Sequence, residues 1–364
     1  MKIAIVVHDF DLTNGQGRYC IELAKRLPEG WSLDVFANTF GVSKMKHWRF
    51  HRVFANRQNH LLTVFSFNRA LKGVLESAQY DIVHAQGSVG SVANVITGHI
   101  CLQARNSFQS PTGFKSRIFP ILVTPLERKF YHRNKEAHLI GVSRSLIGDI
   151  RSYYGFDGSS TVVYHGVDGQ RFGRPTIQTR IALRELLGIA EDVPVILFVG
   201  EAVKGVAMAL RSLTHITDAV LVVVSRSTSS PYVRLARRLG VLERVIFTGF
   251  KKDVAPFYQM ADVFLYPSPY DSFGMVILEA MSCGLPCILS KHIGVAEIID
   301  DGVDGLLCQY DSIESIVGCL SRLLKNRAVA RAVGDAAAHT AGFWTWDRCA
   351  LGTFDVYRRV SERR

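Results

Sequence analysis

The stretch Asp271-Ser-Phe-Gly-Met-Val-Ile-Leu-Glu279-Ala-Met-Ser-Cys-Gly284 places two carboxylates eight positions apart around the start of a predicted helix. The apolar run 262–267 before it ends at a Pro-Ser-Pro break, which predicts a buried parallel strand followed by a turn. Ligands of open α/β sheets bind beyond the carboxyl ends of such strands. Free amides at a helix start favour an anion, and carboxylates accept hydrogen bonds from hydroxyls. The stretch therefore predicts a site for an anionic, hydroxyl-rich ligand, as a sugar nucleotide is.

Short apolar runs alternate with amphipathic segments along both halves of the chain. Strands are predicted at 2–7, 33–36, 81–84, 94–97, 138–142, 161–164, 195–199, 220–224, 245–247, 263–266, 286–289 and 305–308. Helices are predicted at 17–27, 64–77, 115–133, 144–154, 205–213, 232–239, 255–260, 273–281 and 313–325. Strand–helix alternation with short turns is typical of parallel, doubly wound sheets. The predicted fold class is α/β, with two Rossmann-like domains facing a central cleft.

The length of 364 residues exceeds the size at which single hydrophobic cores stop growing. The segment 169–189, with Gly-Gln-Arg-Phe-Gly-Arg-Pro before a linker helix, predicts the seam between two domains. We therefore expect an N-terminal, acceptor-side domain over 1–170 and a C-terminal donor domain over 171–345. The remaining segment, 346–364, is predicted to form a helix that packs back on the N-terminal domain.

The composition is that of an ordinary soluble protein and disfavours several classes. No apolar run approaches the roughly 18 residues that span a bilayer, and segment 1–8 is too short for a signal peptide. The seven cysteines form an odd set without a Cys-x-x-Cys pair, which argues against a disulfide framework and a structural zinc site. We expect a cytoplasmic protein.

The net charge of +11 is concentrated in the first half, where residues 1–170 hold 20 Lys and Arg against 12 Asp and Glu. Cations mix with aromatic residues in 44–54 and 105–135, as on surfaces that bind anionic lipid. Peripheral attachment to the inner face of a membrane and a solvated basic face beside an anionic substrate are both open. We expect no nucleic-acid partner, because no recognition motif accompanies the charge.

Several short motifs follow one another along the chain. They are Asn14-Gly-Gln-Gly-Arg-Tyr19, Asp81-Ile-Val-His-Ala-Gln86, Ile96-Thr-Gly-His99, Val163-Tyr-His-Gly-Val-Asp168, Ile196-Leu-Phe-Val-Gly200 with Lys204-Gly205, and the stretch from Asp271 to Glu279. In this order and spacing the chain resembles the retaining glycosyltransferases of GT-B fold, in particular glycosyltransferase family 4, over nearly its whole length. The resemblance implies a metal-independent hexosyltransferase that moves a sugar from a nucleotide diphosphate, most simply a UDP- or GDP-sugar, with retention of configuration. Its acceptor would be a hydroxyl of a glycan, a lipid-linked glycan or a small molecule, in polysaccharide or lipopolysaccharide biosynthesis.

The resemblance also implies roles for individual residues. Lys204, Asp271 and His99 would serve catalysis, Lys204 on the diphosphate and the other two on the donor sugar. The donor would be held by Gly15, Gly17, Lys204, Arg226, Phe273, Gly274, Met275, Val276 and Glu279, the last on the ribose hydroxyls. Acceptor-side contacts are expected from Arg105, Lys115, Arg117 and Arg128. No metal ligand is implied, and no cofactor besides the donor substrate.

Two departures from the family pattern concern the diphosphate and the sugar. Asp271 is one methylene shorter than the glutamate usual in the family, and Glu201 stands where the family has a diphosphate-binding arginine. Arg226, after the next strand, is a candidate substitute. A weakly active or inactive sugar-nucleotide-binding scaffold of the same fold is therefore a second hypothesis.

Other enzyme classes fit less well. A GT-B nucleotide-sugar epimerase matches the two domains but not the spacing of Asp271 and Glu279. A dehydrogenase is disfavoured because no complete Gly-x-Gly-x-x-Gly follows the first strand of either domain. Asp9-Phe-Asp11 looks like the metal-binding Asp-x-Asp of the other glycosyltransferase fold, but that motif belongs to a different chain organisation.

Overall fold

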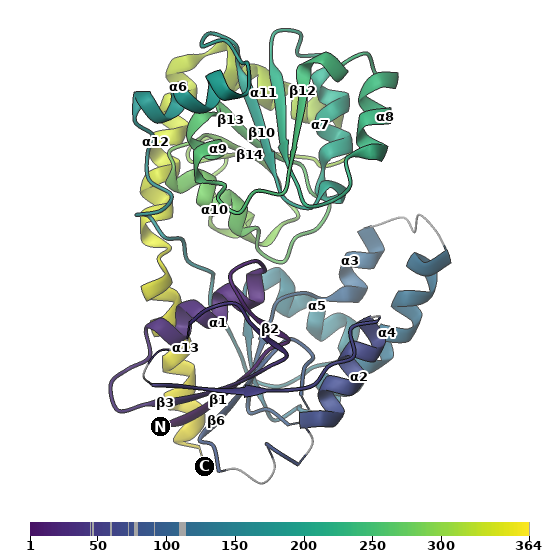
Figure 1. Cartoon of the computed structure of the whole chain (residues 1–364), viewed down its shortest axis with the longest axis vertical. Coiled ribbons are helices and arrows are strands. Elements are labelled where there is room, and N and C mark those ends of the chain that lie inside the picture. The colour runs from purple at the N-terminus through teal and green to yellow at the C-terminus, as the bar shows by residue number, and fades with distance from the viewer. Residues whose placement is uncertain are drawn as a thin grey trace. The chain divides into compact units, whose positions relative to one another are not determined.

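The computed structural model describes residues 1–43, 45, 47–58, 60–71, 73–75, 79–90, 92–108 and 114–363, with the backbone alone for 60–61 and 114–122. The chain divides into two compact units, an N-terminal unit of Met1–His165 with Trp346–Arg364 and a C-terminal unit of Gly166–Thr345 (Figure 1). The predicted seam at 170/171 lies five residues too far along. The reason is that Val167 pairs with Thr345 and donates its amide to the Trp344 carbonyl, which ties residues 166–170 to the C-terminal unit.

A parallel sheet forms the centre of the N-terminal unit. Its strands lie in the order β5 (Trp48–Arg52), β3 (Ser32–Ala37), β1 (Lys2–Val6), β6 (Ile82–Gln86), β7 (Val95–Gly98), β8 (His138–Gly141) and β9 (Ser160–Val162). A separate short pair joins β2 (Asp9–Phe10) to β4 (Thr39–Phe40). Strands β6 and β7 are buried along their whole length, as expected for parallel strands covered by helices on both faces.

Strand β5 lies in a segment where the sequence predicted no strand. Its sequence, Trp-Arg-Phe-His-Arg, buries Trp48, whose indole N–H donates to the Ala24 carbonyl at 3.2 Å. Arg49 and His51 lie 2.7 and 2.9 Å from the buried carboxylate of Asp34, which neutralises charge at this edge of the sheet. Part of the basic segment 44–54 therefore holds an edge strand in place. Lys44 and Lys46 lie outside the described residues.

Helices flank this sheet, with α1 and α13 along one side and α2 to α5 along the other (Figure 1). They are α1 (Gly15–Lys25), α2 (His60–Leu71), α3 (Leu102–Phe108), α4 (Phe114–Arg133), α5 (Arg144–Tyr154) and α13 (Trp346–Ser361). Helix α5 shows why these boundaries arise: the Ser143 hydroxyl caps its start and Gly155, at φ +67°, ends it. Helix α13 packs against α1, β6 and β8. Among the described helices, none is both long and apolar enough to cross a membrane.

The C-terminal unit has a second parallel sheet. Its strands lie in the order β12 (Val245–Gly249), β11 (Val220–Val224), β10 (Val195–Val199), β13 (Val263–Tyr266), β14 (Cys287–Ser290) and β15 (Leu306–Cys308). Its helices are α6 (Ile177–Leu186), α7 (Val206–Leu213), α8 (Ser230–Arg238), α9 (Ala255–Met260), α10 (Met275–Ser282), α11 (Ile313–Lys325) and α12 (Arg327–Phe343), with short 3₁₀ turns η1 (Ala202–Lys204), η2 (Leu242–Arg244) and η3 (Gly294–Ile298). Helix α12, which the sequence patterns did not predict, starts where the Asn326 side chain accepts from the Val329 amide and packs against α10 and α11.

Candidate functional site

The turn after β10 depends on two glycines in conformations that other residues avoid. Gly200, at φ +142°, ends the strand, and Gly205, at φ +143°, precedes α7. A Cβ on Gly205 would lie 2.8 Å from the side chain of Pro267, so glycine lets this turn lie directly against the segment that follows β13. Because β10 and β13 are neighbours, Lys204 in η1 reaches the end of β13.

Lys204 and Asp271 form an ion pair at this edge of the sheet. Lys204 Nζ lies 2.7 Å from Asp271 Oδ2, and the Tyr266 hydroxyl donates to the same oxygen at 2.8 Å. The two charged side chains are 29% and 15% exposed, so water screens the pair weakly. Burial alone would raise the pKa of the Asp271 carboxyl, but Lys204, with hydrogen bonds from Tyr266 and the Phe273 amide, holds that pKa below its usual value. Asp271 is therefore a carboxylate that positions Lys204.

Backbone amides of η3 hold the turn between Asp271 and α10. Gly294 donates its amide to the Asp271 carbonyl at 2.9 Å, and Val295 donates to the Phe273 carbonyl at 2.7 Å. Gly274, at φ +96°, forms the N-cap of α10, and a side chain there would meet Ile277 at 2.9 Å. The carboxylate and the helix start are thus fixed relative to each other.

The start of α10 provides amides for an anion. The first N–H groups of an α-helix have no intrahelical acceptor and lie at its positive end. Among the predicted amides, that of Phe273 already donates to Asp271 Oδ1 at 3.3 Å, and the Phe273 side chain is buried. Phe273 therefore serves the turn, and Met275 and Val276 supply the first helical amides.

Glu279 lies in the next turn of α10 and is buried, with 4% of its surface exposed. The Tyr258 hydroxyl from α9 donates to Glu279 Oε2 at 3.0 Å. A buried carboxylate needs hydrogen-bond partners, and hydroxyl donors meet that need without adding charge. The side chain is therefore placed to receive hydroxyl groups rather than to face bulk solvent.

The two unusual residues near the diphosphate position contact side chains other than Lys204 and Asp271. Glu201 accepts a hydrogen bond from the Ser227 hydroxyl at 2.7 Å. Arg226 is exposed, and its guanidinium lies 4.5 Å from the centre of the Phe250 ring. Within the described residues no hydrogen bond or ion pair joins Arg226 to Lys204 or Asp271. The structure thus places the Arg226 guanidinium over Phe250 and shows no direct bond to Lys204 or Asp271 within the described residues.

His99 follows β7 in the N-terminal unit and is half-buried among other rings. Its imidazole stacks on His165 with centroids 5.7 Å apart, and the Tyr19 ring lies 5.3 Å away, edge-on. Burial and the neighbouring His165 and His84 lower the pKa of His99 well below its usual range, so the ring is neutral. His99 Nε2 lies 2.8 Å from Gln86 Oε1; this nitrogen donates, and Nδ1 is left as the acceptor.

Gly15 and Gly17 begin α1. The Asn14 side chain accepts from the Gly17 amide at 2.7 Å and caps the helix. A Cβ on Gly17 would collide with the carbonyl oxygen of Asp11, so Gly17 is required for packing whatever it does for a ligand. Gly15 is exposed at the first position of the helix.

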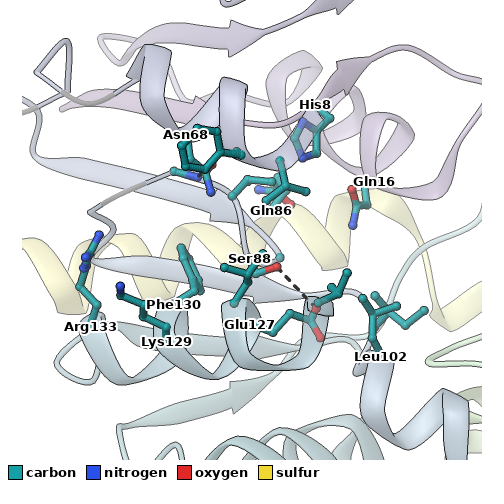
Figure 2. Close-up of a pocket in the computed structure, with 18 of the residues that line it drawn as sticks. His8, Gln16, Asn68, Gln86, Ser88, Leu102, Glu127, Lys129, Phe130 and Arg133 are labelled. Atoms are coloured by element: carbon teal, nitrogen blue, oxygen red, sulfur yellow. Dashed lines mark hydrogen bonds between the residues drawn. The ribbon is translucent and has the colours of Figure 1, made fainter. Parts of the chain in front are cut away.

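A cavity of about 430 Å³ lies in the N-terminal unit between α2 and α4 (Figure 2). Of the predicted acceptor-side residues, Arg105 and Arg128 do not line it. Arg128 donates to the Tyr153 carbonyl at 3.0 Å and so supports the end of α5, and Arg105 lies near the carboxyl of Glu127. The side chains of Lys115 and Arg117 lie outside the described residues.

Sequence reasoning missed the polar residues that do line this cavity, above all Gln86 and Glu127. Gln86 ends the motif that begins at Asp81, but an uncharged amide at a strand end carries little chemical signal. Glu127 lies in an amphipathic helix, where burial of a carboxyl cannot be told from exposure. The one available signal was position, since Gln86 and His99 end neighbouring parallel strands.

Two family models match the chain. The model described as Glycosyltransferase Family 4 matches residues 13–171, and that described as Glycosyl transferases group 1 matches residues 179–340. The uncharacterized glycosyltransferase MJ1607 of Methanocaldococcus jannaschii is 26% identical over 100% of this chain and 99% of its own. A D-inositol 3-phosphate glycosyltransferase of Xylanimonas cellulosilytica is 32% identical over 62% of this chain and 58% of its own.

Solved structures share the fold of this chain. WaaG, a glycosyltransferase involved in lipopolysaccharide biosynthesis, is similar with a TM-score of 0.83 at 20% identity, over 97% of this chain and 99% of WaaG. HepE of Anabaena, solved in complex with UDP-glucose, has a TM-score of 0.75 at 18% identity, over 100% of this chain and 99% of HepE. At these identities the likeness establishes the fold, which is GT-B. With one family model on each unit and this fold throughout, the chain belongs to the family 4 glycosyltransferases of GT-B type.

Proposed function

We propose that this glycosyltransferase moves a sugar from a nucleotide diphosphate to an acceptor hydroxyl with retention of configuration and without a metal ion. The observation that carries the proposal is the Lys204–Asp271 pair at the head of α10, with Glu279 buried one turn further on. This arrangement offers a cation, helix amides and two acids at one edge of the C-terminal sheet.

The leaving diphosphate needs the largest electrostatic support, because negative charge develops on it as the bond to the sugar breaks. Lys204 and the amides of Met275 and Val276 supply that support. Asp271 then accepts from hydroxyls of the donor sugar, and Glu279 accepts from the ribose. The bond from the anomeric carbon to the diphosphate breaks and the bond to the acceptor oxygen forms on the same face. The acceptor proton passes to the departing phosphate oxygen, so no separate protein base is needed.

A UDP-sugar is the first donor to test, since HepE of the same fold was solved with UDP-glucose. A glycan or lipid-linked acceptor is supported by the likeness to WaaG, and a small phosphorylated polyol by the relative named for D-inositol 3-phosphate.

A panel of UDP-, GDP- and ADP-sugars with EDTA present tests the donor site. We expect nucleotide release from one donor class, loss of that release in Glu279→Ala, and no effect of Glu243→Gln, an exposed acid in η2. Product NMR reads the anomeric configuration. Inversion, or release that requires a divalent metal, would contradict the proposal.

Glu201 favours a second candidate, a scaffold that binds sugar nucleotide without turnover. An acid held by Ser227 stands where the family resemblance places a diphosphate cation, and it would repel the phosphates. Binding of a donor without release of nucleotide, unchanged in Glu201→Arg, supports the scaffold. Turnover that increases in Glu201→Arg supports the enzyme.

We also propose peripheral attachment to anionic membrane through the surface around α2. Phe54 is 70% and Phe65 66% exposed, and the segment between them is tied to α2 by the Asn56 amide, which donates to Ser66 Oγ at 2.8 Å. Exposed aromatic rings with nearby cations suit an anionic lipid surface. Sedimentation with vesicles of anionic and neutral lipid tests it: Phe54→Ser with Phe65→Ser should abolish binding that is specific for anionic vesicles. Equal binding to both vesicle types would exclude attachment of this kind.

A further inference from the structure

The cavity between α2 and α4 is lined by both apolar and polar side chains, and these limit which kinds of ligand it can bind (Figure 2). Its walls are apolar, formed by side chains that include Val64 and Phe65 from α2, Leu126 and Phe130 from α4, and Val89. A volume of about 430 Å³ lies within the range of small-molecule sites. Polar groups gather at its two ends, and they differ in kind.

One end holds a buried amide. Gln86 is 1% exposed, and its Oε1 accepts from His99. Its Nε2 atom is buried and has no hydrogen-bond partner among the described residues. Nearly all buried amide groups in proteins are paired, so an amide donor left over at a cavity wall marks a place for an oxygen of a ligand. The same side chain therefore touches both the cavity and His99.

Glu127 lies at the same end, with 5% of its surface exposed. The Tyr154 hydroxyl donates to Glu127 Oε2, and the Ser88 hydroxyl lies 3.5 Å from Oε1 (Figure 2). Burial raises the pKa of this carboxyl to about 7. Near neutral pH a large share of Glu127 is therefore uncharged, and it can exchange hydrogen bonds with a neutral hydroxyl as donor or acceptor.

The other end is cationic. Lys129 and Arg133 from α4 line it, and Arg69 from α2 also lines the cavity; all three are exposed and have no ion-pair partner in the described part of the chain. Six residues separate Glu127 from Arg133, which is about 9 Å along a helix at 1.5 Å per residue. Three cations without an ion-pair partner among the described residues favour an anionic group on the ligand.

We propose that this cavity binds the acceptor, and that the acceptor is a hydroxyl compound carrying a phosphate, with the hydroxyl at the end that holds Gln86 and Glu127 and the phosphate at the cationic end. The inference rests on the proposed function and adds to it the class of the acceptor and a positioning residue. Gln86 holds the hydroxyl with Nε2 while its carbonyl fixes His99. The phosphate belongs either to a free sugar or polyol phosphate or to a lipid-linked one, since both present the same group.

Binding to the full chain without donor tests the proposal. The probes are glucose 6-phosphate, glucose 1-phosphate and octyl β-glucoside 6-phosphate. Glucose and inorganic phosphate, the two parts of these probes, are measured as controls. We expect at least one phosphorylated probe to bind about tenfold or more tightly than either part, as one charge-assisted contact allows. A gain that needs the octyl chain identifies a lipid source, and a gain without it identifies a free phosphate. If no probe binds better than its parts, the proposal is wrong.

Matched variants locate the binding. Lys129→Met with Arg133→Met should abolish the gain from the phosphate, whereas Lys135→Met, an exposed cation just beyond α4, should leave it unchanged. Gln86→Met should weaken glucose-containing probes and leave inorganic phosphate unaffected, a selectivity that a merely structural role would not produce. If both cation variants have the same effect, the gain is non-specific and the cavity is not the site.

The donor reaction separates this inference from the proposed function. Release of UDP from a UDP-sugar in water, without acceptor, should persist in the Lys129 and Arg133 variant. Probe binding without any donor turnover would refute the transferase proposal and leave the cavity assignment standing. Donor turnover with no probe binding would do the reverse.

Discussion

Replacing Lys204 by methionine tests whether this side chain both stabilises the fold and binds the diphosphate. In the structure, Lys204 Nζ lies 2.7 Å from Asp271 Oδ2, with both side chains less than one third exposed. Unit charges at 2.7 Å attract by about 6 kcal/mol at an effective dielectric constant near 20. Desolvation of two partly buried charges offsets most of this, which leaves about 2 kcal/mol of coupling between the two side chains.

The coupling should depend on pH in a definite direction. Lys204 and its neighbours hold the pKa of Asp271 below its usual value against the effect of burial. The stabilisation is therefore fully present above the unfolded pKa of about 3.9 and is lost as pH falls through the lower folded pKa. In Lys204→Met only burial and two hydrogen bonds remain, so the pKa of Asp271 rises and acidification costs this variant less.

Urea unfolding of the wild type, Lys204→Met, Asp271→Asn and the double variant measures the coupling as a double-mutant cycle. Repeating the series with UDP present measures how much UDP binding adds to the free energy of unfolding of each variant. At a UDP concentration 100 times its Kd the wild type should gain about 2.7 kcal/mol. Loss of the cation should weaken UDP binding about 100-fold, so the gain in Lys204→Met should fall to about 0.4 kcal/mol.

Asp271→Asn provides the contrast. It removes the partner of Lys204 but keeps the cation, so UDP should stabilise this variant at least as much as the wild type while sugar transfer is lost. The reasoning would be refuted if Lys204→Met kept the full gain from UDP. It would also be refuted if Asp271→Asn lost as much of that gain as Lys204→Met.

Three further perturbations test other parts of the structure. Gly205→Ala should destabilise the protein by about 3 kcal/mol in urea unfolding, because φ is positive and a Cβ would collide with Pro267. The control Gly240→Ala has a positive φ but open space around it, so it should cost only about 1 kcal/mol. Equal losses of stability in the two variants would exclude the steric argument. Glu279→Gln should keep the hydrogen bond from Tyr258 yet lower UDP affinity about tenfold by calorimetry, and unchanged affinity would remove Glu279 from the site. Glu127, which faces Tyr154, Ser88 and Arg105, has its pKa raised to about 7, so the native state binds the extra proton and stability should fall by about 3 kcal/mol as pH rises from about 4.5 to 7. Glu127→Gln should flatten that slope between pH 5 and 7.5, and an unchanged slope would assign it to another group.

The sequence predicts best where burial is complete. The bounds of β10, β11 and β13 agree with the prediction to the residue, because strands covered on both faces are continuous apolar runs. Strand β5 was not predicted because Arg49 and His51 depend on Asp34, a partner 15 or more positions away. Helix α12 was not predicted because a single residue, Asn326, separates it from α11, so the sequence shows no loop between the two helices.

The candidate site, too, was predicted only in part. The sequence singled out Lys204, Asp271 and Glu279 from their places beside strand ends and a helix start. It could not show that Lys204 and Asp271 pair directly, because that depends on β10 lying next to β13 and on Gly205 lying against Pro267. It could not find Gln86 either, since an amide becomes informative only when its burial and its missing partner are known.

The charge states of the two units suit opposite tasks. In the N-terminal unit burial keeps His99 neutral, lowers the pKa of His84 to about 3 and raises that of Glu127 to about 7, so these three buried groups favour their uncharged forms. In the C-terminal unit Asp271 is ionised against Lys204. A neutral hydroxyl is best held by neutral donors and acceptors, whereas a leaving diphosphate needs a fixed cation and helix amides. Placing an ionised carboxylate at Gln86 would therefore impair the acceptor half specifically: Gln86→Glu should raise the pKa of His99, protonate it near neutral pH and abolish transfer to acceptor while UDP still binds. If transfer and UDP binding declined together in that variant, the assignment of the acceptor to the N-terminal unit and of the donor to the C-terminal unit would be wrong.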